Sequence, residues 1–134
     1  MDTERVSMAG EGLQTVLCTI PMPADLGIGG QIPIGWVLGQ LDQAGAVLPG
    51  GHFRGNVVLV HLDAIEVEAM PRLGDFVTFR ARLLEAGAGR ARVDVQALRS
   101  PRGGQGQEHG QEQILRACLV YALQPPEAGV ALQR

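Results

Sequence analysis

The stretch Ile34–Leu48, IGWVLGQLDQAGAVL, decides the fold of this chain of 134 residues. Its apolar residues recur at helical spacing, namely at Ile34, Val37, Leu38, Leu41 and Leu48. Pro33 stands just before it and Pro49 just after it, as is common at the two ends of a helix. The pattern therefore predicts one helix of about four turns. Because few of its residues are strongly polar, we expect this helix to be buried on most sides.

The segments on both sides of this helix are typical of β-strands, with alternating or β-branched residues. One such segment, Leu13–Ile20, precedes the helix, and the others are Val57–Val67, Asp75–Leu84, Ala91–Ala97 and Leu115–Leu123. Short links such as the Gly87–Gly89 turn favour antiparallel neighbours. A single helix covers only one face of a sheet. We therefore expect an α+β fold, with an antiparallel sheet of about five strands wrapped around one long central helix, that assembles as a homodimer or a higher homo-oligomer.

The length and composition predict a single domain spanning residues 1–134, with its core at about residues 12–124 and flexible segments at both ends. The net charge of −3 and the pI near 5.5 offer no basic surface for nucleic acid. No run approaches the roughly 20 apolar residues of a membrane span, and the N-terminus does not resemble a signal peptide. These features predict a cytoplasmic protein.

Several absences narrow the chemistry. All 11 basic residues are arginine, so the chain has no lysine for a Schiff base or a phosphate-binding loop. Neither serine, Ser7 nor Ser100, lies in a nucleophile elbow. The three histidines do not cluster, so we expect no metal and no cofactor. Cys18 and Cys118 lie in apolar strand-like runs, which predicts buried thiols. The chemistry must rest on carboxylates and backbone amides.

Asp42 is the unusual residue of the predicted helix. Three of its five helical neighbours are glycines; these neighbours are Gly35, Leu38, Gly39, Gly45 and Ala46. Glycine is a poor helix former, so its repeated use on one face needs a reason. One interpretation is a ligand slot with a buried Asp42 at its end. The other is close packing of the helix, with Asp42 solvated or paired with an arginine. The periodicity favours neither.

The residues around this helix resemble a known family. The run Met22–Asp25, MPAD, followed by Gly30–Ala46, GQIPIGWVLGQLDQAGA, is similar to the YciA-type acyl-CoA thioesterases of the hot-dog superfamily. Further similar motifs are Gly55–Val60, Leu73–Asp75 and Ala117–Tyr121, and together they cover most of residues 20–123. Each motif is weak alone, but their order and spacing are specific. One departure is Gly29, which stands where the family has an asparagine.

The resemblance implies a hot-dog fold and an enzyme that hydrolyses acyl-CoA to a free acid and CoA. It implies that Asp42 is the catalytic carboxylate, acting as general base or as nucleophile. Backbone amides around Gly35 and Trp36 would hold the oxyanion, and Leu38 and Gly39 would contribute to substrate binding. The resemblance also suggests that phosphates of coenzyme A bind near the Gly87–Gly89 turn, at Arg90 and Arg92. It implies no metal.

Alternatives remain open at this point. Arg90 and Arg92 also fit a solvated strand face. A non-catalytic module that binds acyl-CoA or an acyl carrier would use the same fold. Retention of Asp42 favours the enzyme, whereas Gly29 in place of the asparagine favours the binding module. A hydroxyacyl dehydratase ranks third, because no histidine precedes Gly51.

Overall fold

The computed structural model describes residues 12–101 and 110–125. Its elements are β1 (Gln14–Thr19), the 3-10 helix η1 (Pro23–Asp25), α1 (Ile34–Phe53), β2 (Val57–Val67), β3 (Phe76–Gly87), β4 (Arg90–Ser100) and β5 (Glu112–Leu123). The two terminal segments expected to be flexible lie outside the described residues. Within those residues, no helix has the length and apolar character needed to cross a membrane.

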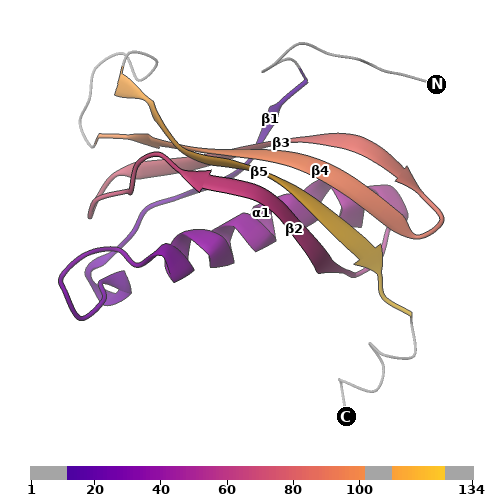
Figure 1. The fold of residues 1–134 in the computed structure, drawn as a ribbon, viewed down its shortest axis with the longest axis horizontal. Helices are drawn as coiled ribbons and strands as arrows, with labels where there is room; N and C mark the ends of the chain where they lie inside the picture. Colours follow the sequence, from indigo (N-terminus) through magenta and orange to yellow (C-terminus); the bar gives the residue numbers. More distant parts are fainter. Residues whose placement is uncertain (1–11, 102–109, 126–134) are drawn as a thin grey trace.

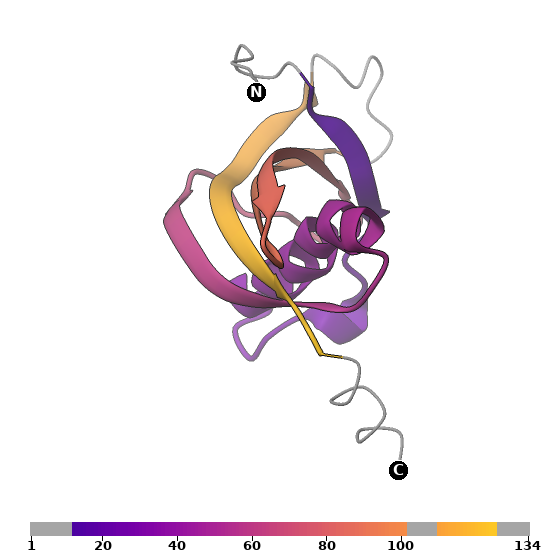
Figure 2. The ribbon, with the colours of Figure 1, turned by 90° about the vertical axis from the view of Figure 1, so that its right-hand side faces the viewer.

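The five strands form one sheet in the order β1-β3-β4-β5-β2, and every neighbouring pair is antiparallel. Helix α1 runs along one face of this sheet (Figure 1). The end-on view in Figure 2 shows the sheet curving around the helix. The predicted fold class, an antiparallel five-stranded sheet around one long helix, is confirmed.

The core lies between α1 and the inner face of the sheet. The predicted alternation is confirmed from Val77 to Ala81 in β3 and from Ala91 to Ala97 in β4, where every second residue is buried, whereas Leu83 is only half-buried. The core residues include Val37, Leu41, Ala44, Val77, Phe79, Val93, Val95, Leu119 and Tyr121. The outer face of the sheet carries ion pairs instead, such as Asp94 with Arg82 and with Arg116. The two faces therefore differ in chemistry as the sequence indicated.

Helix α1 is longer than predicted, because it continues through Pro49 to Phe53. A proline inside a helix removes the hydrogen bond to the carbonyl four residues earlier, here that of Gly45. Pro49 is nevertheless fully buried, and this burial offsets the missing bond. The helix ends at Arg54, which adopts a left-handed conformation with φ 56° and donates its N–H to the Gly50 carbonyl.

Burial of α1 on most sides was also predicted, and within one chain this is wrong. Only one side of the helix is buried, at Val37, Leu41, Ala44, Gly45 and Pro49. The sheet curves around that side alone, so the opposite side stays exposed in spite of its few polar residues. The apolar composition of α1 therefore reflects more than the core of a single chain.

The prediction of buried thiols is wrong as well. A bulge in β1 shifts its alternation just before Leu17, which then lies opposite the buried Phe79. Cys18 consequently lies opposite Thr78 on the outer face, with its Sγ 3.8 Å from the threonine hydroxyl, and is exposed. Cys118 is half-buried on the same outer face. Simple alternation misplaced Cys18 because it does not foresee bulges.

Candidate functional site

Asp42 lies on the exposed side of α1, so within a single chain it is not buried as the ligand-slot interpretation supposed. Gly35 and Gly39 share this side, and a Cβ atom built on either would meet no atom of the described residues within 4 Å. Gly35 and Asp42 are seven positions apart, which corresponds to two helical turns. The three residues thus form a line along the helix, called here the open strip (Gly35, Gly39 and Asp42).

Gly45 has the opposite environment. A Cβ atom at this position would lie 2.5 Å from the Tyr121 hydroxyl oxygen and 3.0 Å from Cδ2 of Leu119. Gly45 is therefore needed for close packing of α1 on β5. Close packing therefore explains Gly45, whereas Gly35 and Gly39 leave space on the side of Asp42.

The partner of Asp42 is a tyrosine that the sequence analysis did not single out. The Tyr121 hydroxyl donates to the backbone carbonyl of Asp42 at 2.8 Å and also lies 3.2 Å from its Oδ1. No arginine pairs with Asp42 among the residues that the structure describes. A signal for Tyr121 did exist: it is the chain's one tyrosine, at an inward position of the last strand.

The environment of Tyr121 keeps its hydroxyl protonated. The side chain is fully buried on the inner face of β5. Burial raises the pKa of Tyr121, and the charge of Asp42 raises this pKa further. The phenol therefore stays a hydrogen-bond donor in the folded protein, and Asp42 is its acceptor.

The first turn of α1 contains backbone amides that donate to no described residue. The Trp36 N–H donates to the Pro33 carbonyl at 3.0 Å, so it is already engaged. The Gly35 N–H donates to no residue in the described ranges. Because the amides at a helix N-terminus attract negative charge, Gly35 is the better oxyanion donor of the two. Trp36 and Leu38 are half-buried and pack against the core.

A hollow of about 790 Å³ lies beside this end of the helix. It is formed by the loop before α1 and by the segment between β2 and β3. Its lining consists of residues 26–34 together with Met70, Pro71, Arg72 and Leu73, and it mixes polar groups with apolar side chains such as Ile32 and Met70. The hollow reaches Ile34, the residue before Gly35.

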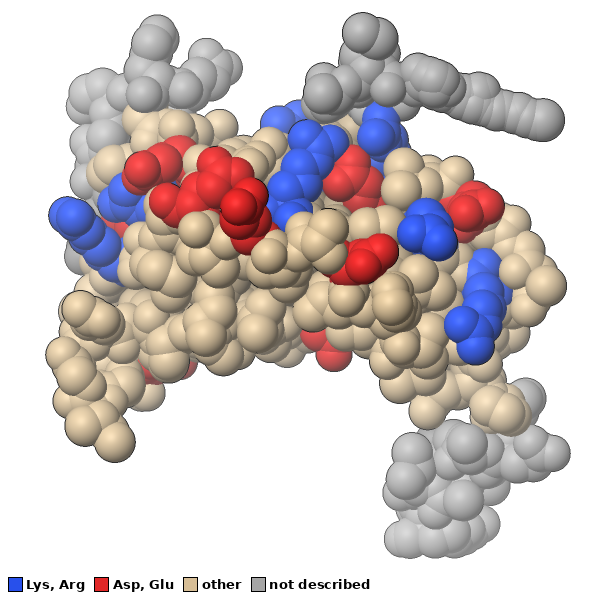
Figure 3. Space-filling view, in the orientation of Figure 1, with Lys and Arg blue, Asp and Glu red and all other residues tan. Residues whose placement is uncertain are grey.

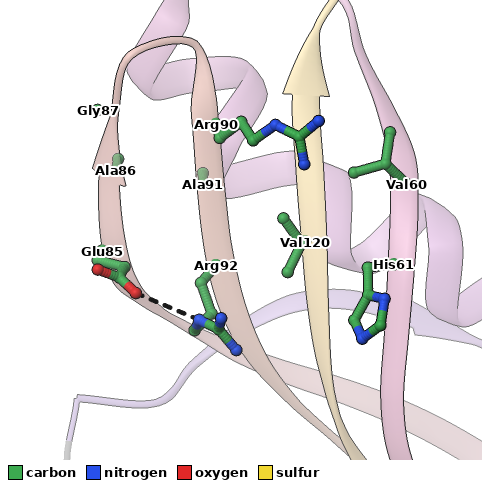
Figure 4. Close-up of a pocket in the computed structure, with 9 residues that line it drawn as sticks. All are labelled: Val60, His61, Glu85, Ala86, Gly87, Arg90, Ala91, Arg92 and Val120. Atoms are coloured by element: carbon green, nitrogen blue, oxygen red, sulfur yellow. Dashed lines mark hydrogen bonds and ion pairs between the residues drawn. The ribbon is translucent and has the colours of Figure 1, made fainter.

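The two predicted phosphate-binding arginines line a separate pocket of about 570 Å³ at the β3–β4 hairpin. Figure 4 shows their side chains with that of His61 in front of the sheet, with α1 behind it. Arg92 donates hydrogen bonds to Cys118 Sγ at 3.5 Å and to Glu85 Oε2 at 3.2 Å. Both contacts raise the pKa of Arg92, and the contact with the Cys118 thiol has the larger effect. Arg90 makes no ion pair with a described residue.

The structure therefore does not bring all predicted site residues together. Gly35, Gly39 and Asp42 share one side of α1. Arg90 and Arg92 lie on the opposite face of the sheet, which separates them from Asp42 in the same chain. Figure 3 shows acidic and basic side chains alternating over the visible surface, with no large basic region there. Within the described part of the chain, no three His, Cys, Asp or Glu residues gather as metal ligands.

Comparisons with known proteins identify relatives. No family model matches the chain. An uncharacterized acyl-CoA thioester hydrolase of Zymomonas mobilis is 32% identical over 101 residues, covering 75% of this chain and 66% of the relative. The acyl-CoA thioester hydrolase YciA of Escherichia coli is 32% identical over 81 residues, covering 60% and 61%. The chain thus spans somewhat less than two thirds of these relatives.

A solved structure supports the same assignment. The crystal structure of a hexameric thioesterase from Yersinia pestis matches with a TM-score of 0.75 and 27% identity, over 84% of this chain and 88% of that one. The sequence motifs, the strand order around α1 and these relatives agree. The chain has the hot-dog fold and is similar in sequence to the YciA-type acyl-CoA thioester hydrolases.

Proposed function

We propose that the protein hydrolyses acyl-CoA thioesters, with Asp42 as general base or nucleophile. The observation that carries this proposal is the open strip, which presents a carboxylate and an unpaired Gly35 amide on one side of the helix. The relatives named above are acyl-CoA thioester hydrolases, which indicates the substrate class.

The geometry of the strip implies a site shared between two copies. Seven residues of helix place the Gly35 amide about 10 Å from Asp42 along the axis. An oxyanion donor and a base must each lie about 3 Å from the reacting group. One chain cannot supply both to the same thioester. Two antiparallel α1 helices would bring Gly35 of one copy beside Asp42 of the other, so the proposed enzyme is at least a homodimer.

The edge of the sheet offers a surface for this assembly. β2 is an outer strand, and its residues Val58, Val60, Leu62 and Val67 are each 40–44% exposed. A long apolar edge strand is a template for pairing with another strand. The Yersinia pestis relative is described as hexameric, which supports association beyond a single chain.

The proposed chemistry uses the residues of the strip. As general base, the Asp42 carboxylate takes a proton from water while the water oxygen attacks the thioester carbonyl carbon. The Gly35 N–H stabilises the resulting oxyanion. The carbon–sulfur bond then breaks, and the CoA sulfur leaves as a thiolate that takes up a proton. As nucleophile, Asp42 would attack the same carbon and form an anhydride, which water then hydrolyses.

The two pockets fit the two ends of such a substrate. The hollow that ends at Ile34 contains apolar side chains, including Leu26, Ile32 and Met70, that could contact an acyl chain. Arg90 and Arg92 are suited to phosphates, but the sheet lies between them and the Asp42 of their own chain. We therefore assign the phosphates of one substrate to the arginines of a neighbouring copy in the assembly.

Asp42→Asn tests the proposal, because asparagine keeps the shape of the side chain but can act neither as base nor as nucleophile. We expect turnover of short, long or aromatic acyl-CoAs to fall about 10²–10⁴-fold. The control is the melting temperature, which should stay close to that of the wild type since Asp42 is exposed. Equal turnover by two well-folded proteins would contradict the role of Asp42. Acyl-CoA binding without any wild-type turnover would identify the non-catalytic module instead.

A further inference from the structure

The contact between β5 and α1 is unusual because a fully buried hydroxyl reaches an exposed carboxylate. Tyr121 faces inward among Ala117 and Leu119, which offer its hydroxyl no polar partner. Buried tyrosines as a rule direct their hydroxyl to an acceptor. Here both acceptors belong to one residue, the carbonyl and Oδ1 of Asp42 at 2.8 and 3.2 Å. The hydroxyl thus ties the Asp42 side chain to its own backbone.

This tie matters because of where Asp42 lies. An exposed aspartate on a helix samples several rotamers. A hydrogen bond to Oδ1 favours one of them, and the other carboxylate oxygen bonds to no residue in the described ranges. A base that is held in one orientation needs less reorganisation when the substrate reacts.

Gly45 makes this contact possible. It lies three residues after Asp42, about one turn further along the helix, and on the buried side of α1. A Cβ atom there would lie 2.5 Å from the Tyr121 hydroxyl oxygen, closer than such atoms can approach. Every other amino acid at position 45 would displace the hydroxyl from Asp42. This need for clearance explains why Gly45, a poor helix former, stands in the middle of α1.

We propose that Tyr121 is a positioning residue for Asp42, and that Gly45 provides the clearance through which its hydroxyl reaches the carboxylate. The inference rests on the proposed hydrolysis only where it predicts a change in kcat. The contact itself can be tested without any activity.

The contact is tested by NMR on protein labelled with [¹³Cζ]tyrosine, which gives a single signal because Tyr121 is the one tyrosine of the chain. Asp42→Asn removes the charge next to the hydroxyl and should shift this signal. Gly45→Ala should shift it too, because the new methyl group displaces the ring. Gly51→Ala is the matched control: it lies in the same helix, and its Cβ would meet nothing within 4 Å. An unchanged signal in Asp42→Asn overturns the proposal.

The kinetic test uses Tyr121→Phe, which keeps the ring and removes only the hydroxyl. We expect kcat to fall about ten-fold, the scale of one hydrogen bond to a charged group, with KM changed by less than about two-fold. Gly45→Ala should lower kcat similarly. The double variant should be no slower than Tyr121→Phe, since the hydroxyl that Gly45 accommodates is already gone.

The outcomes separate this inference from the proposed function. Full wild-type kcat in a well-folded Tyr121→Phe protein overturns the positioning role, even if the NMR contact is present. Multiplied losses in the double variant also overturn it, because they would show two independent structural defects. If Asp42→Asn itself turns over acyl-CoA at the wild-type rate, the proposed function fails, and the positioning role fails with it, while a shifted tyrosine signal still establishes the contact.

Discussion

Gly39 and Gly45 lie fewer than two turns apart in α1, yet the same residue type serves opposite purposes at the two positions. Gly45 is buried against β5, where a side chain would overlap Tyr121 and Leu119. Gly39 is exposed on the open strip, and no residue in the described ranges comes within 4 Å of a Cβ atom built there. One glycine is required by a contact that the chain makes with itself. The other leaves space that the chain does not fill.

The difference teaches that a glycine-rich helix face does not by itself indicate a ligand. The glycines at three and seven positions from Asp42 looked equivalent in the sequence. In the structure, Gly45 belongs to the core, whereas Gly35 and Gly39 lie where a substrate or a second copy can approach. The contrast can be tested by adding side chains at each position.

The largest effect is expected for Gly45→Val. Its Cβ atom would lie 2.5 Å from the Tyr121 hydroxyl oxygen, and two γ-methyl groups would add to the overlap. Overpacking of a filled core costs roughly 1–3 kcal/mol or more, so we expect the free energy of unfolding to fall by about 3 kcal/mol. Urea unfolding followed by circular dichroism measures this. Wild-type stability would show that α1 and β5 are further apart than described.

A smaller effect of opposite sign is expected for Gly39→Ala. Alanine favours a helix over glycine by up to about 1 kcal/mol, and its methyl group would meet no atom within 4 Å in the part of the chain that the structure describes. The free energy of unfolding should therefore rise, while acyl-CoA turnover falls because the methyl group narrows the open strip. Unfolding, sedimentation and kinetics together separate the possibilities. If sedimentation shows that Gly39→Ala dissociates into single chains, the space beside Gly39 is filled by a second copy. If its acyl-CoA kinetics equal those of the wild type, Gly39 is not part of the substrate site.

The smallest effect is expected on the other face of the sheet. Exposed ion pairs contribute roughly 0.2–1 kcal/mol each, so Arg90→Ala and Arg92→Ala should each raise KM for acyl-CoA a few-fold at low salt, with kcat unchanged. The increase should shrink at high salt because charges on the surface are screened. If both variants, and the double variant, keep the wild-type KM at low salt, the pocket at the β3–β4 hairpin does not bind the phosphates.

Much of the fold could be predicted because it depends on local patterns. The alternation in β3 and β4 correctly separated Val77, Phe79 and Val93 from the charged outer face. The errors occurred where distant parts of the chain decide. Pro49 remains helical because its ring is buried by the sheet, and Cys18 faces outward because a bulge in β1 shifts its register against β3.

The sequence by itself determined the order of one long helix and five strands, because this order depends on periodicity. It also determined the family resemblance and the choice of Asp42 as the candidate catalytic residue, because these depend on the order of short motifs. Only the tertiary structure decided which glycines line the core, that Gly35 rather than Trp36 has an unused amide, and that Tyr121 touches Asp42. Asp42 and Tyr121 are separated by 79 positions in the sequence, and no local pattern encodes a contact that forms only when β5 packs against α1.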